Sequence, residues 1–217
     1  MDLFSYLLNN IPYILEKTWE HFYIFLISWS IAVLTGIFIG IISTRQGKEK
    51  IGRIVLSITG ATQAVPSTAV IALVFIFMGI GAMPAMFALF IYSLVPITFN
   101  TASGLMNVSP DMKEAAMGMG MTKMQILFRV ELPSSIPAIA SGIRTAAVIN
   151  IGTAAIASII GAGGLGEIIF IGLRLMNVQR IFAGALPVAL LAIIVDALLA
   201  WLERTIMSEG LLLSKEN

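Results

Sequence analysis

Two charged side chains, Arg144 and Asp196, stand within long apolar stretches of the sequence. Arg144 lies 11 residues after Pro133 and Asp196 lies eight residues before Arg204, which corresponds to roughly 16 Å and 12 Å along a helix. An unpaired charge deep in a bilayer costs at least about 2.5 kcal/mol, so we expect these two to form an ion pair, directly or through water. The alternative is that both lie nearer an interface, with the arginine extended toward it and the aspartate in water.

Few other residues could do chemistry. The sequence has no cysteine, which excludes disulfides, thiolate metal sites and a cysteine nucleophile, and its one histidine, His21, cannot form a histidine metal site alone. The apolar stretches hold no paired carboxylates and no Ser/His arrangement, and no G-x-x-x-x-G-K-[ST] phosphate loop occurs anywhere. We therefore predict no catalytic residue, no metal site and no cofactor on this chain.

Composition indicates which elements must position these residues. Hydrophobic residues make up 58% of the 217 positions and charged residues 12%, about half the charged share of a soluble domain. No Asp, Glu, Lys, Arg or His occurs from residue 54 to residue 110. Such stretches are typical of membrane helices, and the net charge of +1 gives no basic surface for nucleic acid. The sequence predicts an all-α polytopic membrane protein.

Five apolar stretches are long enough to cross a bilayer, which takes roughly 20 residues each. The segment 1–21 instead mixes apolar and polar residues at near-helical spacing, which favours an amphipathic helix in the membrane interface. We thus expect an interfacial segment 1–21, a transmembrane domain 22–204 and a cytoplasmic tail 205–217. The expected spans are about 22–44, 54–79, 83–106, the stretch from Pro133 to just before Gly161, and 181–201.

Two prolines and three amides interrupt the expected spans or lie near them. Proline removes a backbone donor and clashes with the preceding turn, so each proline should kink or break its helix. The amides either line a solute path or form hydrogen bonds between helices, and the second role is the more general one. These candidates for the path or for helix packing are Gln63, Pro66, Pro96, Asn100 and Asn150.

Basic residues are distributed unevenly between the loops. The loops after the first and third spans hold seven lysines and arginines, whereas the opposite side holds three. Because basic residues favour the cytoplasmic side, we expect a multi-pass protein of the cell membrane. Its amino terminus should lie outside and its carboxyl terminus in the cytoplasm.

The polar stretch 107–133, between the third and fourth spans, carries the strongest functional signal. Its helix-start and helix-stop residues predict a short helix, a glycine turn and a second short helix, all exposed to the cytoplasm. In chain order these residues are Ser109 and Pro110 at the first helix start, Gly118 or Gly120 at its end, Thr122 as the cap of the second helix and Pro133 as its terminator.

The same stretch resembles the cytoplasmic signature loop of type I ABC importer permeases. The match consists of Glu114-Ala115-Ala116, Gly120, Val130 and Leu132-Pro133, with isoleucine as the family's usual residue at position 130. The resemblance implies the type I transmembrane fold without enzyme activity. It also implies that the first helix docks on a separate ATPase subunit, which binds ATP and Mg. The two alanines would keep the docking face flat, and Gly120 would supply a turn that a side chain obstructs.

Further stretches resemble one subfamily, the permeases for osmoprotectants such as glycine betaine, carnitine, choline and proline. The resemblance implies an extracytoplasmic substrate-binding protein, ATPase subunits and a second permease, identical or related. One glycine-rich stretch also resembles methionine permeases, so an amino-acid importer is the alternative. The stretches are 63–67, 79–84, 93–97, 142–147, 151–153 and the glycine-rich 160–166.

Other classes of membrane protein fit less well. Ion-coupled secondary transporters usually hold ionisable residues within the membrane, and the first three expected spans contain none. Transport without ATP would indicate such a carrier, and a conductance from this chain alone would indicate a channel.

Overall fold

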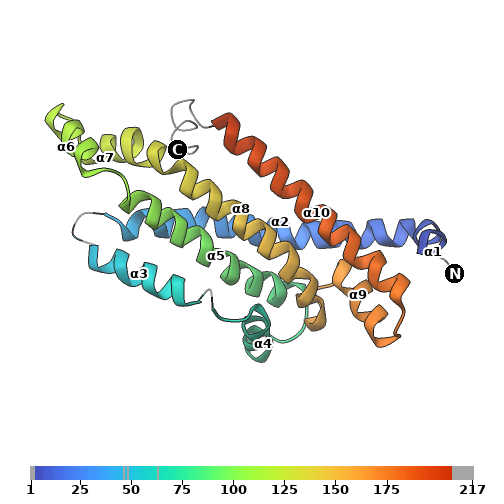
Figure 1. Ribbon diagram of the computed structural model, residues 1–217. Helices are drawn as coiled ribbons and strands as arrows, with labels where there is room; N and C mark the ends of the chain where they lie inside the picture. Colours follow the sequence, from blue (N-terminus) through green and yellow to red (C-terminus); the bar gives the residue numbers. More distant parts are fainter. Residues whose placement is uncertain (1–2, 46, 48, 63, 207–217) are drawn as a thin grey trace.

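The computed structural model describes residues 3–45, 47, 49–62 and 64–206, and every regular element in that part of the chain is a helix (Figure 1). The all-α prediction is therefore confirmed. A π-helical turn, Leu127–Glu131, joins α7 to α8, and a 3₁₀ turn, Ser158–Ile160, follows α8. The α-helices are α1 (Leu3–Asn9), α2 (Ile11–Ser43), α3 (Glu49–Thr62), α4 (Ser67–Met78), α5 (Ala82–Met106), α6 (Pro110–Gly118), α7 (Lys123–Ile126), α8 (Leu132–Ala157), α9 (Leu165–Arg174) and α10 (Val178–Ile206).

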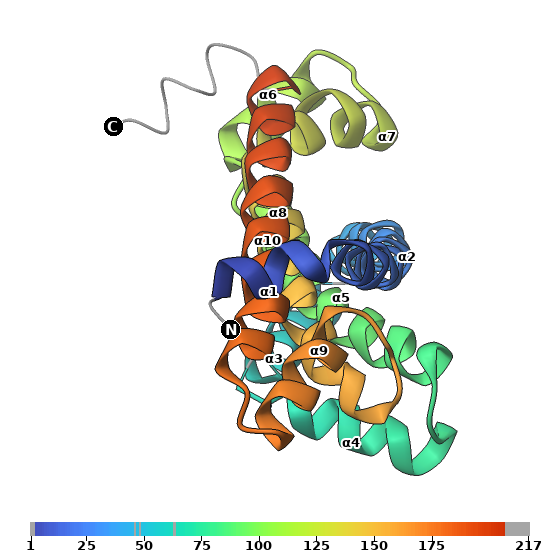
Figure 2. The ribbon, with the colours of Figure 1, turned by 90° about the vertical axis from the view of Figure 1, so that its right-hand side faces the viewer.

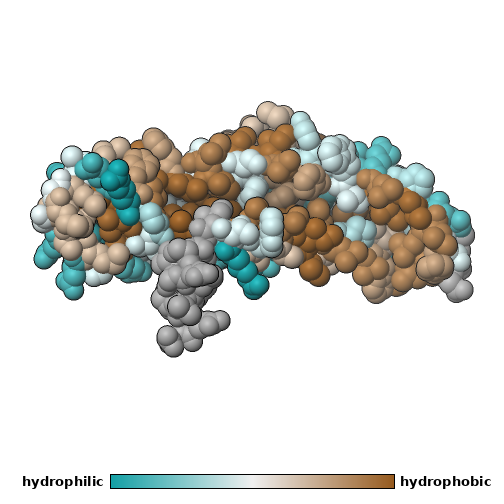
Figure 3. Space-filling model, turned by 90° about the horizontal axis from the view of Figure 1, so that it is seen from above, coloured by the Kyte–Doolittle hydropathy of each residue, from teal (hydrophilic) through white to brown (hydrophobic). Residues whose placement is uncertain are grey.

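Four helical stretches are long and apolar enough to cross a membrane, and a fifth crossing results if the bent pair α3 and α4 counts as one span. The face shown in Figure 3 is largely hydrophobic, with hydrophilic side chains near both of its ends, and α6 lies at the left one. The prediction of a polytopic membrane protein with about five spans is confirmed. The four unbroken stretches are Ile11–Ser43, Ala82–Met106, Lys123–Ile160 and Val178–Thr205.

The helix that contains the first expected span begins before that span, at Ile11. α2 continues unbroken for 33 residues, so no helix end separates residue 21 from residue 22. Between Pro12 and Gly36 the chain contains no glycine or proline that would interrupt a helix. Only α1 is a separate element of the amino-terminal segment, and its place in the membrane interface stays a prediction.

The two prolines in the expected spans behave differently. Pro66 precedes α4 directly, and the axes of α3 and α4 differ there by 98°, so the second span is broken as expected. Gln63 lies outside the described residues. Pro96 is buried within α5, which runs on without a break. There a Cβ on Gly142 of α8 would lie 2.9 Å from the carbonyl oxygen of Pro96, so glycine permits this close helix contact.

The packing centre is α5, which lies against both α2 and α8. Glycines on α2 allow the close approach, because a Cβ on Gly36 would lie 2.7 Å from Ile97 and one on Gly40 would lie 2.6 Å from Thr101. In a bilayer, helices associate through such backbone proximity rather than through a hydrophobic driving force. Small residues therefore fix how these spans pack.

Pro133 does not terminate the second helix of the polar stretch. It occupies the first turn of α8, and the helical path is continuous from Lys123 to Ile160. A proline in an α-helix clashes with the carbonyl four residues earlier, which here belongs to Arg129. That carbonyl lies in the π-helical turn, where the wider helix relieves the clash.

One helix was absent from our expectations. α9 is a short amphipathic helix between the fourth and fifth spans, and it packs against α10. Its sequence has only ten residues, too few for a span, and it follows the glycine run directly. Figures 1 and 2 both place α9 and α4 far from α6 and α7.

Candidate functional site

The polar stretch forms the expected helix, turn and helix at one end of the molecule (Figures 1 and 2). Gly120 follows α6 with φ of 78°, a left-handed conformation that glycine adopts most easily. Thr122 and Gln125 then form a capping box, in which the Thr122 amide donates to the Gln125 side chain at 2.7 Å and the Gln125 amide donates to the Thr122 hydroxyl at 3.3 Å. Ser109 precedes α6 without a side-chain cap bond.

The signature residues do not all face outward. Glu114 and Ala115 are exposed on α6, but Ala116 is 1% exposed and packs inside the chain. Only one of the two alanines is thus available to a partner. A Cβ on Gly120 would meet nothing within 4 Å, so its backbone angle rather than crowding requires glycine, contrary to our expectation. The other signature residues, Val130, Leu132 and Pro133, are partly buried where the π-helical turn enters α8.

An apolar surface accompanies the exposed signature residues, and sequence reasoning missed it. Six of the twelve methionines fall between residues 106 and 124, which is the signal that could have revealed it. Methionine is flexible and polarisable, and it adapts to an irregular partner surface. The residues exposed by 48% to 70% in this region are Met112, Met117, Met119, Met124 and Phe128.

Glu131 connects this end of the molecule to two other elements. Its carboxylate pairs with Arg45, just after α2, at 2.8 Å and with Lys113 of α6 at 3.3 Å. Lys113 also donates to the carbonyl oxygen of Leu105 at 3.3 Å. The Glu131 side chain is 12% exposed, so both ion pairs are partly shielded from water. These contacts hold α6 against the spans.

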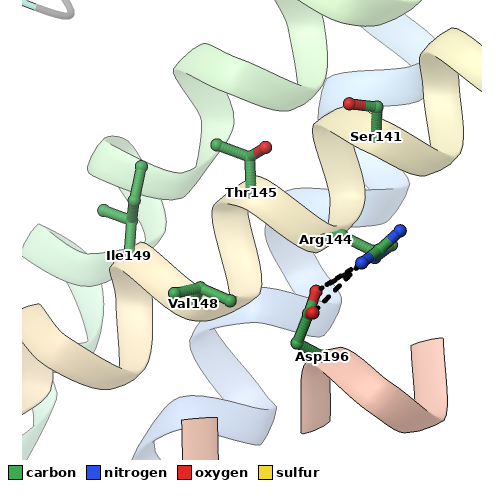
Figure 4. A pocket seen from close by; sticks show the side chains of 6 residues that line it. All are labelled: Ser141, Arg144, Thr145, Val148, Ile149 and Asp196. Carbon is green, nitrogen blue, oxygen red and sulfur yellow. Dashed lines mark hydrogen bonds and ion pairs between the residues drawn. The ribbon is translucent and has the colours of Figure 1, made fainter. Parts of the chain in front are cut away.

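Arg144 and Asp196 are in direct contact (Figure 4). The guanidinium donates to both carboxylate oxygens at 3.0 Å, a two-point geometry that is stronger than a single contact. Its third nitrogen donates to Glu203 at 3.0 Å, which we did not expect. Asp196 and Glu203 are seven residues apart, so they share a face of α10, and this spacing was the available signal.

The amide candidates lie in helix contacts. Asn150 is 1% exposed and donates to Ser28 of α2 at 3.1 Å and to Ser93 of α5 at 2.7 Å, so it joins three helices. Asn100 donates within α5 to the carbonyl oxygen of Pro96 at 2.8 Å. For Asn150 this geometry favours helix packing over a place on a solute path.

The glycine run after α8 is fixed by the first span. Glu20 accepts the Gly164 amide at 2.9 Å, and Lys17 bridges Glu20 and Glu167 at 2.9 Å and 2.8 Å. Nearby, the His21 ring donates to the carbonyl oxygen of Ile151 at 3.0 Å. Within the described part of the chain, no group of three or more His, Cys, Asp and Glu side chains is arranged to hold a metal ion.

Comparison with known proteins identifies the class. Residues 36–208 match the family described as binding-protein-dependent transport system inner membrane component. The chain therefore belongs to this family, and it is a multi-pass transport permease of the type I ABC importer class. The match includes all of the polar stretch 107–133, so this stretch lies within the family's own region.

Two related permeases and one solved structure match this chain over most of its length. The chain is 40% identical over 215 residues to the glycine betaine/carnitine/choline transport system permease protein OpuCB of Bacillus subtilis (strain 168), covering 99% of this chain and 98% of that protein. It is 38% identical to the osmoprotectant import permease protein OsmW of Salmonella typhimurium (strain LT2), covering 97% of this chain and 100% of that protein. A solved structure of the MetNI methionine ABC transporter matches with a TM-score of 0.78 at 21% identity, over 90% of this chain and 96% of that one. The last likeness concerns the fold alone.

Proposed function

We propose that this chain forms the solute path of an osmoprotectant importer that takes up glycine betaine, carnitine, choline or a related compatible solute. The observation that carries the proposal is the identity of about 40% to osmoprotectant permeases over nearly the whole chain. The alternative, a methionine importer, is supported by the resemblance of the single glycine-rich stretch 160–166 and by a structural likeness at 21% identity, which concerns the fold.

The energy of ATP hydrolysis reaches the solute path through the polar stretch 107–133. ATP and Mg are bound by a separate ATPase subunit, and α6 docks on that subunit through Glu114, Ala115 and the exposed methionines. Glu131 links α6 to α2 and α8, so a displacement of α6 is passed to the spans. Rocking of the spans then opens the path to one side of the membrane at a time.

Further subunits complete the transporter. Five spans are too few to enclose a solute path alone, so a second permease, identical or related, covers the other half. A substrate-binding protein delivers the solute from outside. This arrangement requires the orientation expected from the basic residues, with α6 and Glu131 on the cytoplasmic side.

Reconstitution tests the proposal. The chain is placed in proteoliposomes with its second permease, identical or related, its ATPase subunit and its binding protein, and uptake of glycine betaine and ATP hydrolysis are measured together. We expect hydrolysis that glycine betaine stimulates, uptake that requires ATP, and no hydrolysis by the chain alone. Stimulation by methionine but not by any quaternary ammonium solute would contradict the proposal, and so would uptake without ATP.

A further inference from the structure

The ion pair between Arg144 and Asp196 is open on one side. Their side chains are 30% and 39% exposed, whereas Glu203, on the same arginine, is 5% exposed. Both partners of the pair lie well inside helical stretches that can cross the membrane. A charge in contact with lipid at such a position is costly, so the open side must face water or polar groups in the assembled transporter.

A pocket of about 410 Å³ adjoins this open side (Figure 4). This volume is large enough for a small solute. The pocket combines the charged side chains of Arg144 and Asp196 with two hydroxyl groups and two aliphatic side chains, all four of which come from α8. The aliphatic residues Val148 and Ile149 are 40% and 37% exposed. The lining residues are Ser141, Arg144, Thr145, Val148, Ile149 and Asp196.

The pocket presents both signs of charge, because Arg144 and Asp196 both line it. Glu203, which also accepts from Arg144, is 5% exposed and does not line the pocket. Arginine has five N–H donors, and the contacts described for Arg144 use three of them. The site therefore offers a carboxylate for a cation and remaining N–H donors for an anion, side by side.

We propose that this pocket is a transient binding station for a small zwitterion that carries a quaternary ammonium group and a carboxylate. The ammonium group, which has no N–H to donate, lies against Asp196 and the aliphatic groups of Val148 and Ile149. The solute's carboxylate accepts from Arg144 and from the hydroxyls of Ser141 and Thr145. This assignment rests on the proposed function and adds to it the place where the solute pauses within the membrane.

Cysteine labelling tests the station without measuring transport. The chain has no cysteine, so Thr145→Cys introduces a single thiol into the pocket. The assembled transporter in nanodiscs is treated with a trimethylammonium methanethiosulfonate or a sulfonate methanethiosulfonate, and labelling is quantified on this chain. Rates are expressed relative to those of a free thiol in solution. Ala154→Cys, at a site in the same helix that is 3% exposed, is the buried control.

Three results are expected. After this correction, Asp196→Asn added to Thr145→Cys should lower the ratio of the cationic to the anionic labelling rate roughly tenfold, because it removes one negative charge about 6 Å away in water. Glu16→Gln, which removes an exposed acid elsewhere, should leave this ratio unchanged. Glycine betaine should slow labelling at Thr145→Cys several-fold, and methionine should not.

Contrary results would show whether the binding station alone or the proposed function as well is wrong. An unreactive Thr145→Cys, a ratio of cationic to anionic labelling that Asp196→Asn leaves unchanged, or protection by methionine in place of glycine betaine would each overturn the station. Uptake of glycine betaine by the unmodified transporter is measured in parallel. If uptake occurs while labelling fails, the station alone is wrong, and if uptake fails, the proposed function is wrong as well.

Discussion

At Gly120 the requirement for glycine lies in the backbone rather than in the space around it. Its φ of 78° is costly for a residue with a Cβ, by roughly 1–2 kcal/mol, and more so for a β-branched one. Gly118, two residues earlier, also has no neighbour within 4 Å of a Cβ, but it has ordinary helical geometry at the end of α6. Substitutions at Gly118 and Gly120 therefore test the effect of backbone conformation separately from that of crowding.

We predict that Gly120→Val inserts into the membrane normally but abolishes most ATP-driven uptake, because the turn that sets α6 against α7 is lost. Gly118→Ala is the matched control and should retain uptake, since alanine suits a helix better than glycine does. Uptake in proteoliposomes and co-purification of the ATPase subunit measure the two effects. Normal uptake by Gly120→Val would contradict the assigned role of the turn.

Individual contacts were only partly accessible from the sequence. The rise per residue of a helix predicted similar depths in the membrane for Arg144 and Asp196, and the structure shows these two side chains in contact. Glu203 was missed because helix rise gives the depth of a residue but not its face, and Glu203 lies seven residues after Asp196 on the same face of α10. Which alanine of the signature turns inward depends on how α6 packs, and residue types alone do not reveal it.

Among the elements, α2, α6 and α8 meet at Glu131. Its pairs with Arg45 and Lys113 are partly exposed, and pairs of that kind contribute roughly 0.2–1 kcal/mol each. Such energies matter little for the stability of the whole protein. They matter more for the position of a short helix, because α6 has few other contacts with the spans.

We predict that Glu131→Gln separates ATP hydrolysis from transport. The melting temperature of the purified complex should change little, whereas the amount of solute taken up per ATP should fall several-fold, because α6 moves without moving α8. Glu16→Gln serves as the acid-to-amide control and should leave this ratio unchanged. A large loss of thermal stability with an unchanged ratio would instead make Glu131 a purely structural residue.

The places of the membrane helices in the chain followed from the apolar runs, but helix ends did not. Pro133 was expected to stop a helix, and the π-helical turn before it allows the helix to continue. α9 was missed because the search for spans passes over helices of ten residues. Both failures concern local backbone geometry, which hydropathy does not report.

At the scale of the whole molecule, the ion pair joins the fourth span to the fifth. Arg144→Asp would place three carboxyl groups together, and Asp196→Arg would place two guanidinium groups beside one carboxylate. We predict that each change reduces the amount of assembled transporter severalfold, because charges within the membrane lose their partners. Size-exclusion chromatography of the solubilised complex measures this amount.

Combining the two changes should restore part of the assembly, because opposite charges again face each other. The rescue should be incomplete, since Glu203 then lies near an aspartate at position 144, and adding Glu203→Gln should improve it. The double variant could instead lose as much assembled transporter as the two single changes together. That result would show that the pair does not fix how the spans pack.

The continuous helical path from Lys123 to Ile160 has a mechanical consequence. Its 38 residues correspond to roughly 57 Å, so one rod reaches from the α7 end of the molecule to the glycine run at the other end. If the rod tilts as a unit by about 10°, its far tip travels about 10 Å. A modest rotation at the α7 end is thus geometrically amplified at the glycine run, with no need for any span to refold.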